Sequence, residues 1–155
     1  MASKKRILVA VDFSPTSRAA FAEAVNLARG VGGTVEVVHV YEPSAYMGPQ
    51  SLVLVPVNLA QKWELTRAHI AKELDAFLGA GHGAEALHIE IGQAADAIPA
   101  LVRSGKFDLV FMGAHGGGGI SRVVGKVTEA VMKRAPCAVL TIHLPERTAR
   151  ETIPL

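Results

Sequence analysis

The chain has 155 residues, of which 50% are hydrophobic and 19% are charged, so it has enough apolar material to fold as a single domain. Its formal net charge is only +2, whereas nucleic-acid-binding proteins usually carry a much larger positive charge on one surface, so no nucleic-acid partner is expected. A single cysteine, Cys137, excludes an internal disulfide and a cysteine-rich zinc site. No apolar run approaches the ~20 residues that span a bilayer, and the amino-terminal apolar run is too short for a signal peptide. A cytoplasmic protein without a membrane partner is expected.

Short apolar runs rich in Val and Ile predict five β-strands. Most of these runs do not alternate with polar residues, which is typical of strands buried on both faces of a parallel sheet. In chain order they cover residues 7–11, 35–40, 87–91, 109–112 and 138–142.

Helical patterns lie between these runs, over residues 14–30, 59–78, 94–103 and 125–134. Ser14 can cap the first helix, and Pro15 suits its first position. Pro99 lies inside the third helix and is expected to kink it or to shift its start. Ala135-Pro136 ends the fourth helix.

The order of the predicted elements is β-α-β-α-β-α-β-α-β. Such alternation predicts a doubly wound α/β domain, a parallel sheet with helices on both faces. Ligands bind such sheets beyond the carboxyl ends of the strands, where the strand order reverses. The irregular stretch 42–58 interrupts the pattern, and it is compatible with a lid, an interface segment or a packed surface loop.

A glycine-rich segment, residues 113–128, follows the fourth strand and opens the fourth helix. Glycines let backbone amides approach an anion, and a helix start adds free N–H groups, so this pattern favours phosphate binding. The segment does not match the P-loop, because Ile120 stands at the first required glycine and Val127 follows the lysine. It does not match the dinucleotide fingerprint G-x-G-x-x-G either. A plain glycine-rich connection is the alternative interpretation.

Five stretches resemble the universal stress protein family: residues 7–14, 37–40, Gly92 with 95–98, 107–116 and 135–140. The family's loop has Gly-x-x-Gly, a spacer, and then Gly with a small polar residue, after a strand that ends in Met-Gly. The resemblance covers nearly the whole chain as one domain, with a core at about 5–143 and a tail at 144–155. It implies a three-layer α/β/α fold of the adenine nucleotide alpha hydrolase type, with a five-stranded parallel sheet in the order 3-2-1-4-5. It also implies dimerisation and, in one subclass, ATP binding.

The resemblance also implies which residues of this sequence would bind the nucleotide. Asp12 and Ala10 would contact the adenine side, Val40 would pack near the base, and Met112 and Gly113 would meet the base and ribose. The phosphates would be held by Gly116, Gly125 and the amides of Lys126, Val127 and Thr128. For Asp12, a purely local role as a turn residue is the alternative.

This sequence departs from the family's loop in two ways. The spacer, residues 117–124, has eight residues where the family usually has nine, and Lys126 replaces the Ser or Thr after the third glycine. The lysine can strengthen phosphate binding, or it can be a surface lysine in an unused loop. Any Mg²⁺ is expected to be carried by the phosphates, because no carboxylate cluster is visible.

No residue is predicted to be catalytic. His115 lies in the glycine segment and can contact a phosphate or carry a proton, but such a histidine is more often structural. The remaining histidines have no metal-ligand spacing, and His82 is expected to be exposed within a glycine cluster. Cys137 is expected to be a small core residue.

The fifth strand is expected to lie at an edge of the sheet. Because it is apolar and has no lysine or proline guard, it can pair with a second copy of the chain. The predicted dimer interface consists of Ala138, Val139, Leu140, Thr141 and Ile142. The alternative is that the tail, residues 144–155, covers this edge.

The function expected from the sequence is therefore a non-enzymatic stress-response module that binds ATP or a related adenine nucleotide. Nucleotide occupancy would modulate the dimer or the choice of an unidentified protein partner. One alternative is a nucleotide-free dimeric interaction module of the same fold. Another is an enzyme that acts on a phosphorylated small molecule in the same crevice.

Overall fold

The computed structural model describes residues 3–43, 58–115 and 124–144. Five strands and four helices alternate there, and the strands form one parallel sheet in the order β3-β2-β1-β4-β5, as predicted. The bounds are β1 (Arg6–Ala10), α1 (Pro15–Val31), β2 (Thr34–Tyr41), α2 (Leu59–Leu78), β3 (Ala86–Ile91), α3 (Ala94–Gly105), β4 (Leu109–Gly113), α4 (Lys126–Arg134) and β5 (Ala138–Ile142).

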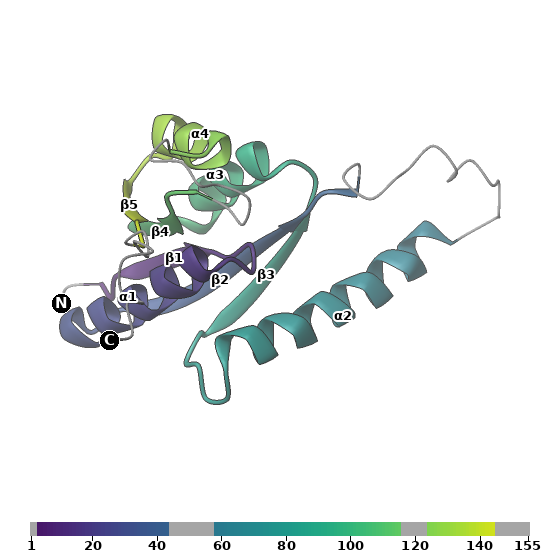
Figure 1. Ribbon diagram of the computed structural model, residues 1–155, viewed down its shortest axis with the longest axis horizontal. Coiled ribbons are helices and arrows are strands. Elements are labelled where there is room, and N and C mark those ends of the chain that lie inside the picture. Colours follow the sequence, from purple (N-terminus) through teal and green to yellow (C-terminus); the bar gives the residue numbers. More distant parts are fainter. Residues whose placement is uncertain (1–2, 44–57, 116–123, 145–155) are drawn as a thin grey trace, which may run out of the picture.

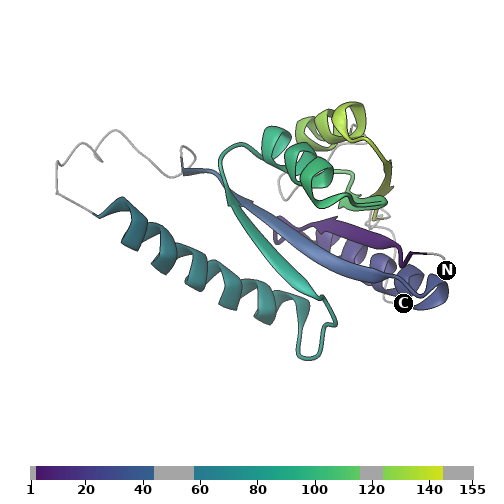
Figure 2. The same ribbon diagram turned by 180° about the vertical axis from the view of Figure 1, so that it is seen from behind.

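The sheet is the middle of three layers. Helices α1 and α2 cover one face and α3 and α4 cover the other (Figures 1 and 2). Because side chains alternate along a strand, β1 sends Ile7 and Val9 into the core under α1 and α2, and Leu8 into the core under α3 and α4. All three are fully buried. This two-sided burial explains why the strand runs are apolar without alternation.

Helix α1 begins and ends as its residues predict. The Ser14 side chain accepts a hydrogen bond from the N–H of Ser17, and Pro15 occupies the start of the helix. Gly32 ends it with a left-handed φ of 67°, and its N–H donates to the carbonyl of Ala28.

Helix α3 continues through Pro99, and its start at Ala94 is not shifted. Proline has no N–H, so the carbonyl of Ala95, four residues earlier, loses its helical donor. Arg134 at the end of α4 donates to this carbonyl at 2.9 Å and to Asp96 at 2.6 Å. Helix α4 therefore supplies, through Arg134, the hydrogen bond that the Ala95 carbonyl loses to the proline.

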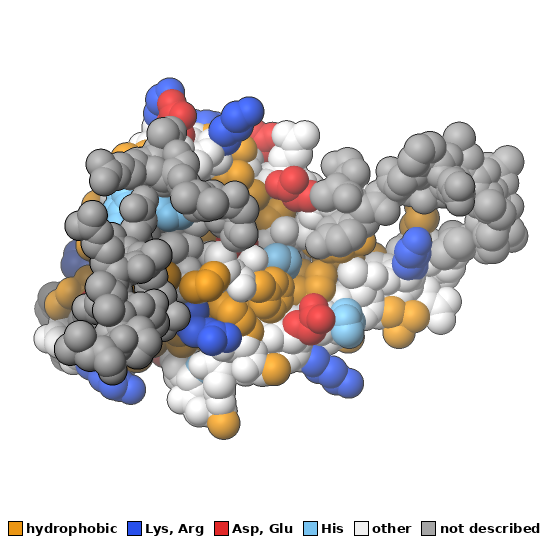
Figure 3. All heavy atoms as spheres, in the orientation of Figure 1, with side chains coloured by type: hydrophobic (Ala, Val, Ile, Leu, Met, Phe, Trp, Pro, Cys, Tyr) orange, Lys and Arg blue, Asp and Glu red, His pale blue; other side chains and the backbone are white. Residues whose placement is uncertain are grey.

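Helix α2 packs on the sheet with only part of its length. Its buried residues are Ile70 and Leu74, whereas Leu59 and Leu65 are 77% and 68% exposed. In both ribbon views its amino-terminal half extends away from the sheet (Figures 1 and 2). Hydrophobic side chains remain visible between α1 and α2, with charged side chains around them (Figure 3).

The predicted exposure of His82 is wrong, because its side chain is only 16% exposed. The N–H of Ala84 donates to its Nδ1 at 3.1 Å, and its Nε2 donates to Asp75 at 3.0 Å. The imidazole thus closes the turn between α2 and β3. Glycines alone made the turn look open in the sequence.

A buried carboxylate, Glu36, lies near the amino ends of the strands on the α3 and α4 side. Arg6 donates to its Oε1 at 2.6 and 3.2 Å, and the Nε2 of His88 donates to its Oε2 at 2.7 Å. Burial acts to raise the pKa of Glu36, but the hydrogen bonds and charges of His88 and Arg6 outweigh it and lower the pKa below the usual range.

Candidate functional site

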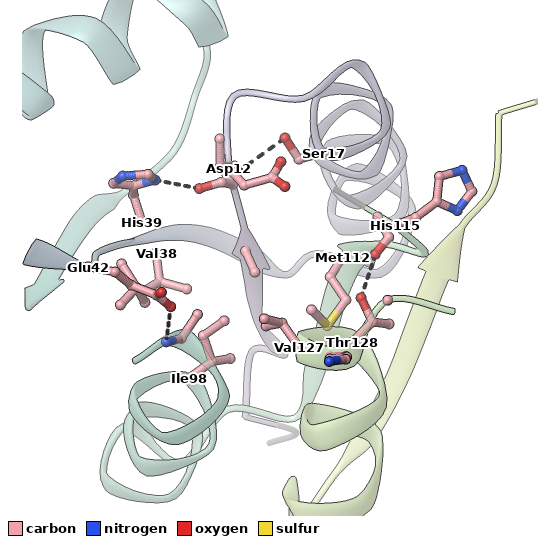
Figure 4. A pocket seen from close by; sticks show the side chains of 17 residues that line it. Asp12, Ser17, Val38, His39, Glu42, Ile98, Met112, His115, Val127 and Thr128 are labelled. Carbon is pink, nitrogen blue, oxygen red and sulfur yellow. Dashed lines mark hydrogen bonds between the residues drawn. The ribbon is translucent and has the colours of Figure 1, made fainter. Parts of the chain in front are cut away.

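A cavity of about 360 Å³ lies at the carboxyl ends of β1, β2 and β4, between the amino termini of α3 and α4 (Figure 4). The volume is within the range of small-molecule pockets, ~300–1,000 Å³. The strand order reverses between β1 and β4, so the cavity lies where the topology predicts a ligand site.

Every predicted nucleotide-binding residue that the structure describes lines this cavity. Gly116 lies outside the described residues, as do Arg122 and the spacer except Val124. The lining residues that the sequence predicted are Ala10, Asp12, Val40, Met112, Gly113, Gly125, Lys126, Val127 and Thr128.

Strand alternation makes the floor of the cavity apolar. Ala10, Val38 and Met112 belong to the core cluster on the α3 and α4 side, where Ile98 of α3 packs with them. Each follows a residue that points to the opposite core, because successive side chains alternate across the sheet. An aromatic base or another flat apolar group fits such a floor.

The amino terminus of α4 gives the cavity its donor end. The first N–H groups of a helix have no intrahelical acceptor, and here they belong to Lys126, Val127 and Thr128. The preceding N–H, that of Gly125, donates to the carbonyl of Ala114 at 2.7 Å, so this amide is already hydrogen-bonded within the chain, although Gly125 itself lines the cavity. Three amides, the positive end of the helix dipole and the exposed Lys126 can together bind an anion.

Two buried threonine hydroxyls hold this end of the cavity in place. Thr128 donates to the carbonyl of Gly113 at 2.9 Å and ties α4 to β4. Thr16 of α1 donates to the carbonyl of His115 at 2.8 Å, and its Oγ1 lies 3.0 Å from the Oγ of Ser14. The start of the glycine segment is therefore fixed from both sides of the sheet.

Asp12 has the local turn role that the sequence left open. Its Oδ1 accepts from the N–H of Ser14 at 3.0 Å and from the Ser14 hydroxyl. Asp12 is nevertheless exposed to solvent and lines the cavity. The next residue, Phe13, has a left-handed φ of 63°, which is unfavourable for a bulky side chain, and its ring packs on His39 and Phe77.

Glu42 is a cavity residue that the sequence reasoning missed. It follows β2 on the same face as Val38 and Val40, and this alternation was the signal that could have identified it. Its Oε1 accepts the N–H of Ala94 at 2.8 Å, at the first position of α3 (Figure 4). The other lining residues beyond the prediction are Val11, Ser17, Val38, His39, Ala94, Ile98 and His115.

The two histidines of the lining direct their rings elsewhere. The Nδ1 of His39 donates to the carbonyl of Val11 at 2.7 Å. The imidazole of His115 points away from the cavity, towards β5, and its centroid lies 6.0 Å from that of His143 (Figure 4). This orientation does not place His115 where it could contact a phosphate in the cavity. Its Nδ1 is buried and has no hydrogen-bond partner among the described residues.

Cys137 precedes β5 and is half-buried. Burial raises the pKa of its thiol, and the charge of Asp108 adds to this shift. A thiol held protonated is a poor nucleophile, in agreement with the packing role expected for it. Within residues 3–43, 58–115 and 124–144, no group of three or more His, Cys, Asp or Glu side chains could hold a metal ion. In the same part of the chain, no helix has both the length and the apolar character needed to cross a bilayer.

Comparison with known proteins agrees with this architecture. The chain is 31% identical over 144 residues to universal stress protein A homolog 1 of Coxiella burnetii, an alignment that covers 92% of this chain and 98% of the relative. Its fold is similar to that of the universal stress protein UspA from Lactobacillus plantarum, with a TM-score of 0.69 and 29% identity over 92% of this chain and all of that one.

A universal stress protein solved in complex with cAMP has the same fold, with a TM-score of 0.60 and 22% identity over 92% of this chain and 98% of that one. The sequence model of the universal stress protein family matches residues 4–143. All of the stretches quoted above lie within the matched residues, and the predicted strand order agrees with the fold of these relatives. The chain therefore belongs to the universal stress protein family.

Proposed function

We propose that this protein binds ATP or a related adenine nucleotide in the cavity between α3 and α4, and that it does so as a cytoplasmic stress-response module. The observation that carries the proposal is the amino terminus of α4, where three amides that no described side chain caps and the Lys126 side chain border a cavity with an apolar floor. A family relative solved in complex with cAMP supports an adenine nucleotide as the ligand.

The residues present fit such a ligand at both ends. The amides of Lys126, Val127 and Thr128 would hold the phosphates, and Lys126 would add a charge where the family has a hydroxyl. The base would lie over the apolar floor formed by Ala10, Val38 and Met112, with Val40 beside it. Mg²⁺ would arrive on the phosphates, since no carboxylate cluster competes for it among the described residues. We propose binding without turnover, because neither lining histidine is directed into the cavity as a base.

Charge reversal at the start of α4 tests the binding site. Calorimetric titration with Mg-ATP should show that Lys126→Glu raises the Kd at least about tenfold, which corresponds to 1.4 kcal/mol. An acidic residue in the first turn of a helix is favourable to the helix itself, so the variant should remain folded. The matched control is Lys62→Glu, which introduces the same charge near the start of α2 and does not line the cavity.

Two results would contradict the proposal. One is a wild-type protein that shows no heat with millimolar Mg-ATP while its circular dichroism spectrum is that of a folded α/β domain. The other is equal affinity of wild type and Lys126→Glu.

We further propose that the protein is a homodimer paired through β5 and that nucleotide occupancy modulates this dimer. Strand β5 pairs only with β4 in the described sheet, and Leu140 on it is 39% exposed. Light scattering after gel filtration should give a dimer mass for the wild type and a monomer mass for Leu140→Lys. The control Leu65→Lys, on the exposed part of α2, should remain dimeric. Wild-type protein that elutes as a monomer would contradict the proposal.

A nucleotide-free dimeric interaction module is the second candidate function. It is favoured by the eight-residue spacer and by Lys126 in place of the family's hydroxyl. A stable dimer that binds no adenine nucleotide would support this candidate over the first.

A further inference from the structure

Helices α3 and α4 both begin at the rim of the cavity. They differ in whether a side chain of this protein accepts a hydrogen bond from the first backbone N–H of the helix. At α4 no described side chain caps the helix, because its N-cap residue is Gly125. At α3 the N-cap Gln93 makes no side-chain hydrogen bond either, yet the first amide of the helix is satisfied, because Glu42 reaches it from the end of β2. A carboxylate of this chain thus occupies the position that an anion would take at α3.

The charged side chains around the cavity also differ between the α3 side and the α4 side. Among the described lining residues, the acidic side chains are Asp12 and Glu42, and the lysine is Lys126 at α4. Glu42 lies across the cavity from Val127 and Thr128 (Figure 4). A ligand in this cavity therefore meets hydrogen-bond donors and a positive charge at one end, and the Glu42 carboxylate at the other.

We infer that Glu42 is a specificity-determining residue, which restricts the cavity to ligands that carry their phosphates at one end only. This inference rests on the proposed nucleotide binding and adds to it which nucleotides are excluded. The excluded class is nucleotides with a second phosphate on the far side of the ribose, such as ATP with an additional 3′-phosphate. Such a group would have to displace Glu42 from α3 or lie beside its charge, and like charges in close contact are strongly unfavourable.

Glu42→Gln separates the charge of this residue from its capping role. The amide oxygen of glutamine can still accept the N–H of Ala94, so α3 keeps its cap while the cavity loses one negative charge. Glu90→Gln is the matched control: it removes the same charge from the neighbouring strand β3 at a residue that does not line the cavity.

The first experiment compares Mg-ATP with its 3′-phosphorylated form by calorimetry. The wild type should prefer Mg-ATP at least about tenfold, the scale of one unfavourable charge contact in a partly exposed site. Glu42→Gln should reduce that preference at least about threefold, and Glu90→Gln should leave it unchanged. If the wild type binds both ligands equally, or if the two variants change the preference equally, the inference is wrong while the proposed function stands.

The second experiment uses inorganic phosphate and does not depend on nucleotide binding. In amide-resolved NMR spectra, phosphate should shift the resonances of Lys126, Val127 and Thr128 in the wild type and leave Ala94 unchanged. In Glu42→Ala the Ala94 amide is free and should respond as well. An Ala94 amide that responds in the wild type, or that stays silent in Glu42→Ala, would overturn the inference. If the wild type binds no ATP, the proposed function fails and this titration alone decides the role of Glu42.

Discussion

Gly113 ends β4 at the wall of the cavity, and the structure gives a reason for glycine there that does not involve a ligand. A Cβ at this position would lie 2.7 Å from the Oγ1 and 2.9 Å from the Cβ of Thr16, whereas ordinary contact begins at 3.4 Å. Thr16 cannot move aside freely, because it is buried in the first turn of α1 and donates to the carbonyl of His115. We therefore expect Gly113→Ala to separate β4 from α1 by about 0.5–0.7 Å, at a cost of about 1–3 kcal/mol in the free energy of unfolding.

Urea denaturation of four proteins measures this clash: wild type, Gly113→Ala, Thr16→Ala and the double variant. Thr16→Ala alone should cost about 1 kcal/mol, because it removes the donor to the carbonyl of His115. It also removes the nearer of the two clashing atoms, so Gly113→Ala should cost about 1 kcal/mol less in the Thr16→Ala background. Equal costs in the two backgrounds would refute the reasoning.

Gly125 is the matched control, since it borders the same cavity. A Cβ there would lie 3.6 Å from the carbonyl oxygen of Ala114 and from the Cα of His115, which is ordinary contact. Gly125→Ala should cost at most about 1 kcal/mol, from the weaker N-cap preference of alanine, and this cost should not depend on Thr16. A Cβ at Gly113 would meet α1 at Thr16. A loss of ligand binding in Gly113→Ala would therefore indicate that β4 and α1 have been pushed apart.

Two further predictions concern the core. Because the folded-state pKa of Glu36 is lowered by His88 and Arg6, its ion pairs stabilise the protein above about pH 4.5 and are lost as the pH falls through that lowered pKa. The stability difference between wild type and Glu36→Gln, measured by urea denaturation, should shrink from pH 7 to pH 3, and a constant difference would contradict this. Leu74→Ala should cost about 2–5 kcal/mol, because Leu74 is fully buried and is one of two buried residues of α2. A cost below about 1 kcal/mol in thermal unfolding would mean that α2 is not packed as described.

Many features of the molecule could be predicted from the sequence because they depend on local patterns. Apolar runs and capping residues such as Ser14 placed every strand within one residue and placed α2 correctly. The parallel order then predicted a site at the carboxyl ends of the strands, and the resemblance to the family named the residues there. The periodicity of apolar residues is sufficient to predict the helices and strands, because each signal lies within a few residues of the element that it specifies, whereas the strand order and the site residues came from the family resemblance.

Only the tertiary structure decided how those residues are used. The cap that Glu42 gives to α3 joins positions 52 residues apart, and the hydrogen bond from Thr16 to the carbonyl of His115 joins positions 99 apart. The His115 imidazole likewise packs against the ring of His143, which follows β5 in the chain. Such contacts are fixed by how strands and helices pack against one another, and no local pattern encodes that packing. The sequence by itself predicted the fold and the position of the cavity, and only packing decided which further side chains line that cavity and where their hydrogen bonds go.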